Sequence, residues 1–151
     1  DVLTKNGRER MSVEQMGYGY RTSVFKRGEI HAIVLSALLR LKNSAKEEVS
    51  VKIEQFSERR KATQPPGASM GSMFKNPEGD HAGRLIEAAG LKGTCIGTAE
   101  ISTLHGNFFI NHGETRADDI LALIRLVQKT VHEKFGVQLE LEVELVGEWN
   151  E

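Results

Sequence analysis

The alternation of hydrophobic and polar residues is most regular in the last third of the chain, where it predicts a long helix. Beyond residue 115, apolar side chains recur at the three- and four-residue intervals of one helical face. They are Ile120, Leu123, Ile124, Val127, Val131 and Phe135. Thr115 can cap this helix, Asp118 can act as the acid of a capping box, and Gly136 can end the helix.

A different pattern follows this helix. Residues 137–145 alternate between apolar and polar side chains, which predicts a half-buried strand. Its polar face carries Glu140, Glu142 and Glu144, and the default interpretation of such a row is a solvated surface. Nothing local distinguishes Glu142 from its two acidic neighbours.

Shorter elements are predicted in the middle of the chain. Residues 97–103 and 107–111 are typical of short strands. A helix is predicted to start at Asp80 or His81 and to end at Gly90.

Another helix is predicted over residues 45–61, which lack Gly and Pro. Val49, Ile53 and Phe56 are spaced by four and three residues, as on the apolar face of an amphipathic helix. The basic residues 59–61 suit either a ligand or the negative end of the helix dipole, and we favour the dipole.

The first 43 residues are typical of strands and turns. Asn6-Gly7 is a hairpin turn signal between residues 2–4 and residues 10–13. The apolar segment 30–41 is long enough for a helix or a strand, and we favour a strand.

Residues 17–21 alternate small and aromatic side chains. If this segment is extended, Tyr18 and Tyr20 share one face and Arg21 points from the other.

Composition limits the class of protein. The 151 residues are 39% hydrophobic and 27% charged, which suits one or two small globular units, and the order of elements predicts an α+β fold. A net charge of -1 offers no electrostatic argument for nucleic acid or a membrane surface as a partner. The single cysteine, Cys95, excludes an internal disulfide and fits a reducing cytoplasm, and without a His-x-x-x-His pair we expect no metal site.

The segment from residue 70 to residue 77 carries the densest chemistry. Gly71 allows the backbone to approach a ligand, and Ser72, Lys75 and Asn76 place a hydroxyl, a cation and an amide before Pro77. A polar loop that leads into a helix amino terminus predicts an anion site, and the alternative is an ordinary turn.

Six stretches together resemble the UDP-N-acetylenolpyruvoylglucosamine reductase (MurB) family, in the family's order. They are GYRTSVFK (19–26), QP (64–65), GSMFKNP (71–77), AGRLIEAAGLKG (82–93), LHGNFFIN (104–111) and FGVQLELEV (135–143). Each motif alone is weak, but their ordered combination over nearly the whole chain is specific. The chain shows no insertion with an extra substrate-clamping tyrosine, which resembles the shorter, type II form of the family.

The resemblance implies a domain organisation. Residues 1–43 match the tail of a FAD-binding domain with a PCMH/VAO-like fold, and residues 44–151 match the substrate-binding domain. Family members open with a glycine-rich flavin phosphate loop, which is not found here. Because the chain starts at Asp1 rather than at methionine, we expect a piece of a longer enzyme that binds FAD weakly and is inactive alone.

The resemblance also implies an activity. NADPH reduces FAD, and the flavin then reduces UDP-N-acetylglucosamine enolpyruvate to UDP-N-acetylmuramate in the cytoplasm. This reaction belongs to peptidoglycan precursor synthesis, and so to cell wall biogenesis, cell shape and cell division.

Three residues match the family's catalytic positions. Ser72 matches the proton donor, and its alternative role is to form a turn. Arg21 matches the arginine at the substrate carboxylate, where a guanidinium can bind in bidentate fashion, and its alternative is a surface ion pair beside Glu14. Glu142 matches a second acid that assists enol formation, and only the resemblance distinguishes it from its neighbours.

Three further residues match positions near the ligands. Lys75 and Asn76 match residues near the UDP-sugar, and Tyr20 can pack on flavin or substrate, or in a core. Two other functions stay open: a non-catalytic UDP-sugar-binding domain, and a relative among the wider flavin-domain oxidases. The resemblance in the substrate half argues against the oxidases.

Overall fold

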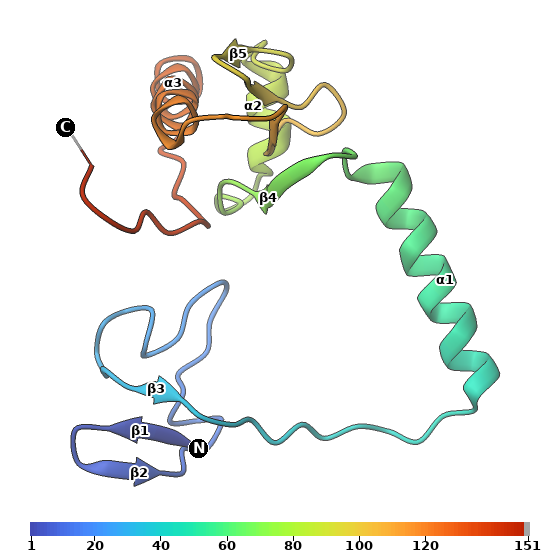
Figure 1. The fold of residues 1–151 in the computed structure, drawn as a ribbon, viewed down its shortest axis with the longest axis vertical. Helices are drawn as coiled ribbons and strands as arrows, with labels where there is room; N and C mark the ends of the chain where they lie inside the picture. Colours follow the sequence, from blue (N-terminus) through green and yellow to red (C-terminus); the bar gives the residue numbers. More distant parts are fainter. Residues whose placement is uncertain (150–151) are drawn as a thin grey trace. The chain divides into compact units, whose positions relative to one another are not determined.

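A computed structural model describes residues 1–149 of the chain, in a mixed α+β arrangement (Figure 1). The chain forms two compact units, Asp1–Lys46 and a second that begins at Glu47. Each unit has its own small sheet.

The first unit begins with the predicted hairpin. Strand β1 (Val2–Thr4) pairs antiparallel with β2 (Gly7–Glu9), and β3 (Ile33–Val34) pairs with the other edge of β1. The hairpin is confirmed, but the second strand is not at residues 10–13. Ser12 N–H donates to Gln15 Oε1 and Gln15 N–H to Ser12 Oγ, so these amides are satisfied in a local turn instead of a ladder.

In the first unit, the extended geometry considered for residues 17–21 does not occur, and the strand favoured for residues 30–41 is confirmed only in part. Residues 17–21 are not extended, because Gly19 and Thr22 exchange backbone hydrogen bonds across a two-residue reversal formed by Tyr20 and Arg21. The segment 30–41 is a strand only at β3. Beyond β3, the backbone of this segment pairs only with Asp1, whose C=O accepts hydrogen bonds from the N–H groups of residues 35 and 36.

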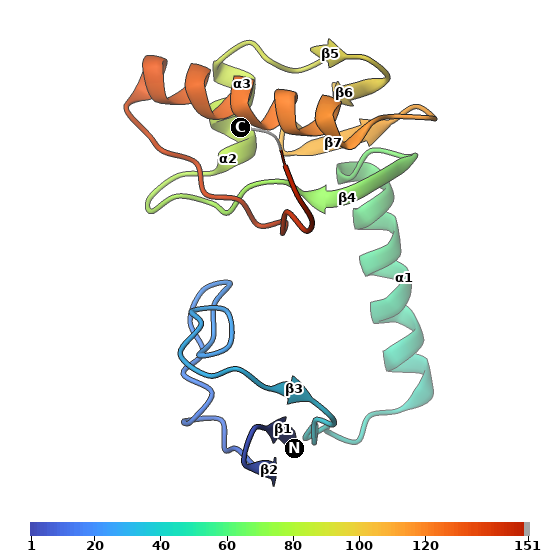
Figure 2. The same cartoon turned by 60° about the vertical axis from the view of Figure 1, so that its left-hand side comes forward.

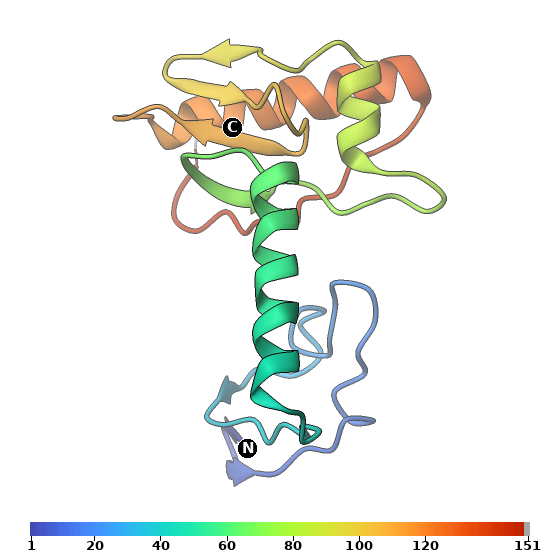
Figure 3. The same ribbon diagram turned by 90° about the vertical axis from the view of Figure 1, so that its right-hand side faces the viewer.

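Helix α1 (Lys46–Thr63), which belongs to the second unit from Glu47 onward, confirms the helix predicted at 45–61. Acidic residues lie in its first turn and basic residues in its last turn, as the helix dipole favours. The expected apolar face is nevertheless exposed, with Ile53 at 60% and Phe56 at 64%. Figure 3 shows α1 extending away from the sheet of this unit.

That sheet has four antiparallel strands in the order β4-β7-β6-β5. The strands are β4 (Ala68–Ser72), β5 (Cys95–Ile96), β6 (Ala99–Ile101) and β7 (Phe108–Asn111). The strands predicted at 97–103 and 107–111 are therefore confirmed in position, and β5 was missed.

Two helices complete the core. Helix α2 (Ala82–Ala88) matches its prediction, and α3 (Ala117–Phe135) lies along the sheet in Figure 2. The core contains the apolar face predicted for α3 together with side chains of the sheet and α2. Its fully buried members include Leu85, Ile86, Ile101, Phe109, Leu123, Ile124, Val127 and Val131.

The carboxy-terminal end of α3 was predicted correctly, and its amino-terminal cap was not. Gly136 follows the helix with φ of 70°, which confirms the predicted stop. The N-cap is Arg116 and not Thr115, because Thr115 Oγ1 is hydrogen-bonded to Thr98 Oγ1 at 2.8 Å.

Residues 137–145 are not a strand, and that prediction is wrong. Only Leu141 forms a bridge, antiparallel to Phe74. The alternation still governs burial, since Leu139 is buried and Leu141 and Val143 pack partly against the core. Gln128 Nε2 donates to the C=O of Leu139 at 2.9 Å, so a side chain replaces part of a ladder.

Candidate functional site

Ser72 lies at the end of β4 and not in the polar loop that we expected. The pairing of Ser69 with Ile110 and of Ser72 with Phe108 leaves an extra residue on β4, which is a β-bulge. Gly71 lies in this bulge with φ of 83°, a conformation that favours glycine. A bulge redirects the side chain that follows it, and here that side chain is Ser72, which lines a cavity of about 320 Å³.

Glu142 is joined to the residue next to Ser72. Its N–H donates to the C=O of Met73 at 2.9 Å, beside the bridge between Phe74 and Leu141. The structure therefore brings the backbones of two predicted catalytic residues together from positions 70 residues apart.

Burial distinguishes Glu142 from the other two glutamates. Glu140 and Glu144 are exposed, whereas Glu142 is half-buried. The row that sequence alone presents as three equivalent acids is thus not uniform, because residue 142 is held against the bulged strand.

Lys75 and Asn76 have partners within the second unit. Lys75 Nζ lies 3.0 Å from Glu140 Oε2, and its backbone N–H donates to the C=O of Glu140. Asn76 Oδ1 accepts a hydrogen bond from the N–H of Ala82 at 3.1 Å, which caps the first turn of α2. Asn76 therefore orders the chain after Ser72, and a contact of either residue with substrate stays a prediction.

The amino end of α2 is already occupied by protein groups in addition to Asn76. Asp80 Oδ1 accepts a hydrogen bond from the N–H of His81, and the carboxylate pairs with Arg84. The hydrogen bond from Arg84 is the main reason that the pKa of Asp80 is lowered to about 2. These side chains satisfy groups to which we expected an anion to bind.

Tyr20 and Arg21 lie in the first unit. They form the two-residue turn between Gly19 and Thr22, both are exposed, and Arg21 has φ of 55°. The meeting of Arg21 with Ser72 and Glu142, which belong to the second unit, stays a prediction.

Two residues at the Ser72 cavity were missed as candidates. His105 and Asn107 both line it, and the N–H of Asn107 donates to His105 Nδ1 at 3.2 Å. Burial lowers the pKa of His105, which favours the neutral ring that this acceptor role requires. The only signal in the sequence was their place in the stretch 104–111, where Asn107 looks like the start of a strand.

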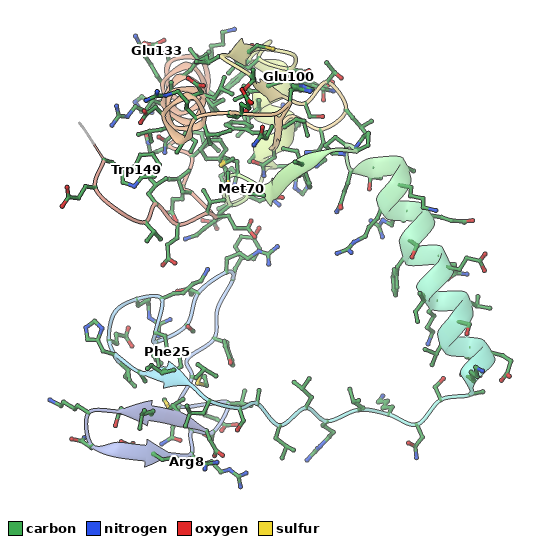
Figure 4. All side chains as sticks on the ribbon, viewed as in Figure 1. Arg8, Phe25, Met70, Glu100, Glu133 and Trp149 are labelled. Carbon is green, nitrogen blue, oxygen red and sulfur yellow. The ribbon has the colours of Figure 1, made fainter. Side chains whose placement is uncertain are left out.

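A larger cavity of about 520 Å³ lies between β4, α3 and the end of the described chain. Met70 and Trp149, labelled in Figure 4, are among its lining residues. Its lining is mostly apolar and includes none of the predicted site residues.

Within residues 1–149 the structure contains no group of three or more His, Cys, Asp or Glu side chains placed to hold a metal ion. In the same range, every helix is too short or too polar to cross a membrane.

The second unit is thus an α+β domain in which the Ser72 segment and residues 140–142 lie side by side. Residues 62–146 match the sequence model of a family described as UDP-N-acetylenolpyruvoylglucosamine reductase, C-terminal domain. A Bacillus licheniformis protein named UDP-N-acetylenolpyruvoylglucosamine reductase is 43% identical over 89% of this chain and 73% of its own length. A Chloroflexus aggregans protein of the same name is 48% identical over 95% of this chain and 50% of its own length.

A solved structure agrees with these sequence matches. The crystal structure of UDP-N-acetylenolpyruvylglucosamine reductase (MurB) from Thermus caldophilus is similar with a TM-score of 0.79 and 41% identity, over 95% of this chain and 50% of that chain. The chain belongs to the UDP-N-acetylenolpyruvoylglucosamine reductase family. It spans about half the length of several of the curated relatives that it matches.

Proposed function

We propose that the chain is the carboxy-terminal half of a reductase that converts UDP-N-acetylglucosamine enolpyruvate to UDP-N-acetylmuramate, with NADPH and FAD, in the cytoplasm. Residues 1–43 would complete the FAD-binding domain, and residues 44–151 would bind the UDP-sugar. The observation that carries the proposal is the hydrogen bond that joins Glu142 to the bulged segment directly after Ser72. Sequence similarity along the whole chain supports it.

The residues of the first unit fit only part of a flavin site. A concave surface between β1, β3 and Phe25 offers apolar contacts and the cation of Lys5. The sequence has no glycine-rich phosphate loop. We therefore expect the chain alone to bind FAD weakly.

In the complete reductase, FAD that NADPH has reduced would supply the hydride that adds to the terminal carbon of the enolpyruvyl double bond. Negative charge then develops on the adjacent carbon, which carries the carboxylate. The Ser72 hydroxyl donates its proton to that carbon, so one hydride and one proton reduce the double bond. In this scheme Arg21 binds the carboxylate with two parallel N–H donors, and Glu142 stabilises the enol form.

The test uses a complete reductase polypeptide, in which a flavin-binding half precedes Asp1, and measures the two half-reactions separately. With Ser72→Ala, NADPH should still bleach the flavin absorbance, but adding the enolpyruvyl substrate should not restore it. Ser57→Ala is the matched control, because Ser57 is exposed on α1 and donates only to the C=O of Ile53.

The outcomes separate two errors. Substrate-dependent reoxidation at the normal rate in Ser72→Ala would show that the serine is not the proton donor. An unsubstituted reductase that reacts with NADPH but never with the enolpyruvyl substrate would show that the proposed reaction is wrong.

A further inference from the structure

Asn107 precedes β7 and is only 3% exposed. Its Oδ1 accepts a hydrogen bond from the N–H of Phe74 at 2.9 Å, and its Nδ2 donates to the C=O of the same residue at 2.8 Å. Its own backbone C=O accepts from the N–H of Met73 at 2.8 Å. The carboxamide therefore pairs with Phe74 as the peptide group of a neighbouring strand would.

The opposite edge of this segment is held by the residues around Glu142. The C=O of Met73 accepts from the N–H of Glu142, and the N–H of Lys75 donates to the C=O of Glu140. Residues 73–75 thus lie between the side chain of Asn107 and residues 140–142. Without the Asn107 carboxamide, Phe74 would lose both of its hydrogen bonds on this side, and residues 140–142 would still hold the segment from the other side.

The loop that presents Asn107 is itself fixed by short-range contacts. Ser102 Oγ accepts hydrogen bonds from the N–H groups of Leu104 and His105, at 3.1 and 3.3 Å. A side-chain carbon added at Gly106 would lie 3.0 Å from the C=O of Gly83, so the loop packs closely against α2. These contacts fix the position of Asn107, and Asn107 in turn fixes the backbone of Phe74.

We propose that Asn107 is a positioning residue of the reductase site, which keeps Ser72 and Glu142 in place relative to each other by holding Phe74 against the segment 140–142. This role rests on the proposed function, since it concerns the same proton transfer. Proton donation depends on the placement of the donor, and a misplacement of 1 Å can cost about 100-fold in rate. Asn107 acts through the backbone of Phe74 and does not need to contact the substrate.

The first test variant is Asn107→Leu, which keeps the shape of the side chain and removes both hydrogen bonds. In the complete reductase, flavin reduction by NADPH should be unchanged, while reoxidation by the enolpyruvyl substrate should slow by about 10- to 100-fold. Hydrogen exchange should show faster exchange of the Phe74 and Glu142 amides. The control is Val131→Ala, a fully buried change on α3 that removes no side-chain hydrogen bond from either segment.

The second variant, Asn107→Asp, covers the case in which Asn107→Leu does not fold. A protonated carboxyl group has the same donor and acceptor as the amide, whereas the carboxylate has no donor for the C=O of Phe74. Burial raises the pKa of a carboxyl group, so reoxidation by this variant should recover, relative to the unsubstituted enzyme, as the pH falls.

Three results would overturn the proposal. If Asn107→Leu reoxidises at the unsubstituted rate, Asn107 has no positioning role, while the proposed reaction stands. If both half-reactions slow equally, as for a general loss of stability, the residue is structural only. If the unsubstituted enzyme itself fails with the enolpyruvyl substrate, the proposed function is wrong and the positioning role fails with it.

Discussion

The bulge before Ser72 permits a test in which the cost comes from the backbone alone. Gly71 has φ of 83°, and among the described residues a Cβ at this position would meet no atom within 4 Å. Gly71→Ala should therefore create no clash, and its whole cost should come from forcing a side chain into the left-handed region. That cost is about 1–2 kcal/mol in unfolding free energy.

Gly136 provides the matched control. It has φ of 70°, is equally open among the described residues, and follows α3 instead of preceding Ser72. Gly136→Ala should lose a similar amount of stability in urea denaturation followed by circular dichroism. Only Gly71→Ala should also slow the substrate-dependent reoxidation of the complete reductase, because relief of the strain shifts the bulge and turns Ser72 away.

Gly71→Asn refines the test, since asparagine tolerates the left-handed region better than alanine and should lose less stability. If Gly71→Ala changes the unfolding free energy by less than about 0.5 kcal/mol, the range of ordinary surface substitutions, the strain argument is wrong. If its stability falls but reoxidation is unaffected, the bulge does not orient Ser72.

Two further predictions concern the core and the pH dependence. Leu123→Ala should lower the unfolding free energy by about 2–5 kcal/mol, because Leu123 is fully buried. Leu38→Ala is the control: Leu38 is 92% exposed, so this change should alter the unfolding free energy by less than about 0.5 kcal/mol. Equal losses for the two variants in urea denaturation would refute the core assignment. Burial lowers the pKa of His105 in the folded state, so the folded protein favours the neutral ring. The stability that this contributes is fully present above the unfolded-state pKa of about 6.5, and it is lost as the pH falls through the folded-state pKa. His105→Gln should flatten the dependence of unfolding free energy on pH across that window, and an unchanged slope would show that another group titrates there.

Local pattern was sufficient for much of the secondary structure. The apolar spacing on α3 and the glycine after it predicted that helix to within a few residues, and the hairpin signal at Asn6-Gly7 located β1 and the turn but not the bounds of β2. These features depend on neighbours within one or two turns of chain. The ordered motifs likewise indicated the family, which the comparisons show.

The errors occurred where a segment needed a distant partner. Residues 137–145 have the alternation of a strand, yet only Leu141 forms a bridge, because side chains and isolated backbone bonds from Gln128, Met73 and Lys75 take the place of a continuous ladder. The same limit applies to 30–41, where pairing stops at Asp1.

Sequence by itself determined which residues are candidates for the chemistry, since the resemblance of the motifs singled out the hydroxyl of Ser72 and the carboxyl of Glu142. Only the tertiary structure decided that Gly71 forms a bulge, that Glu142 is half-buried while Glu140 is exposed, and that Asn107 holds the backbone beside them. The physical reason is that residue type and periodicity are local properties. Register and burial, in contrast, depend on which distant backbone groups find each other when the chain folds.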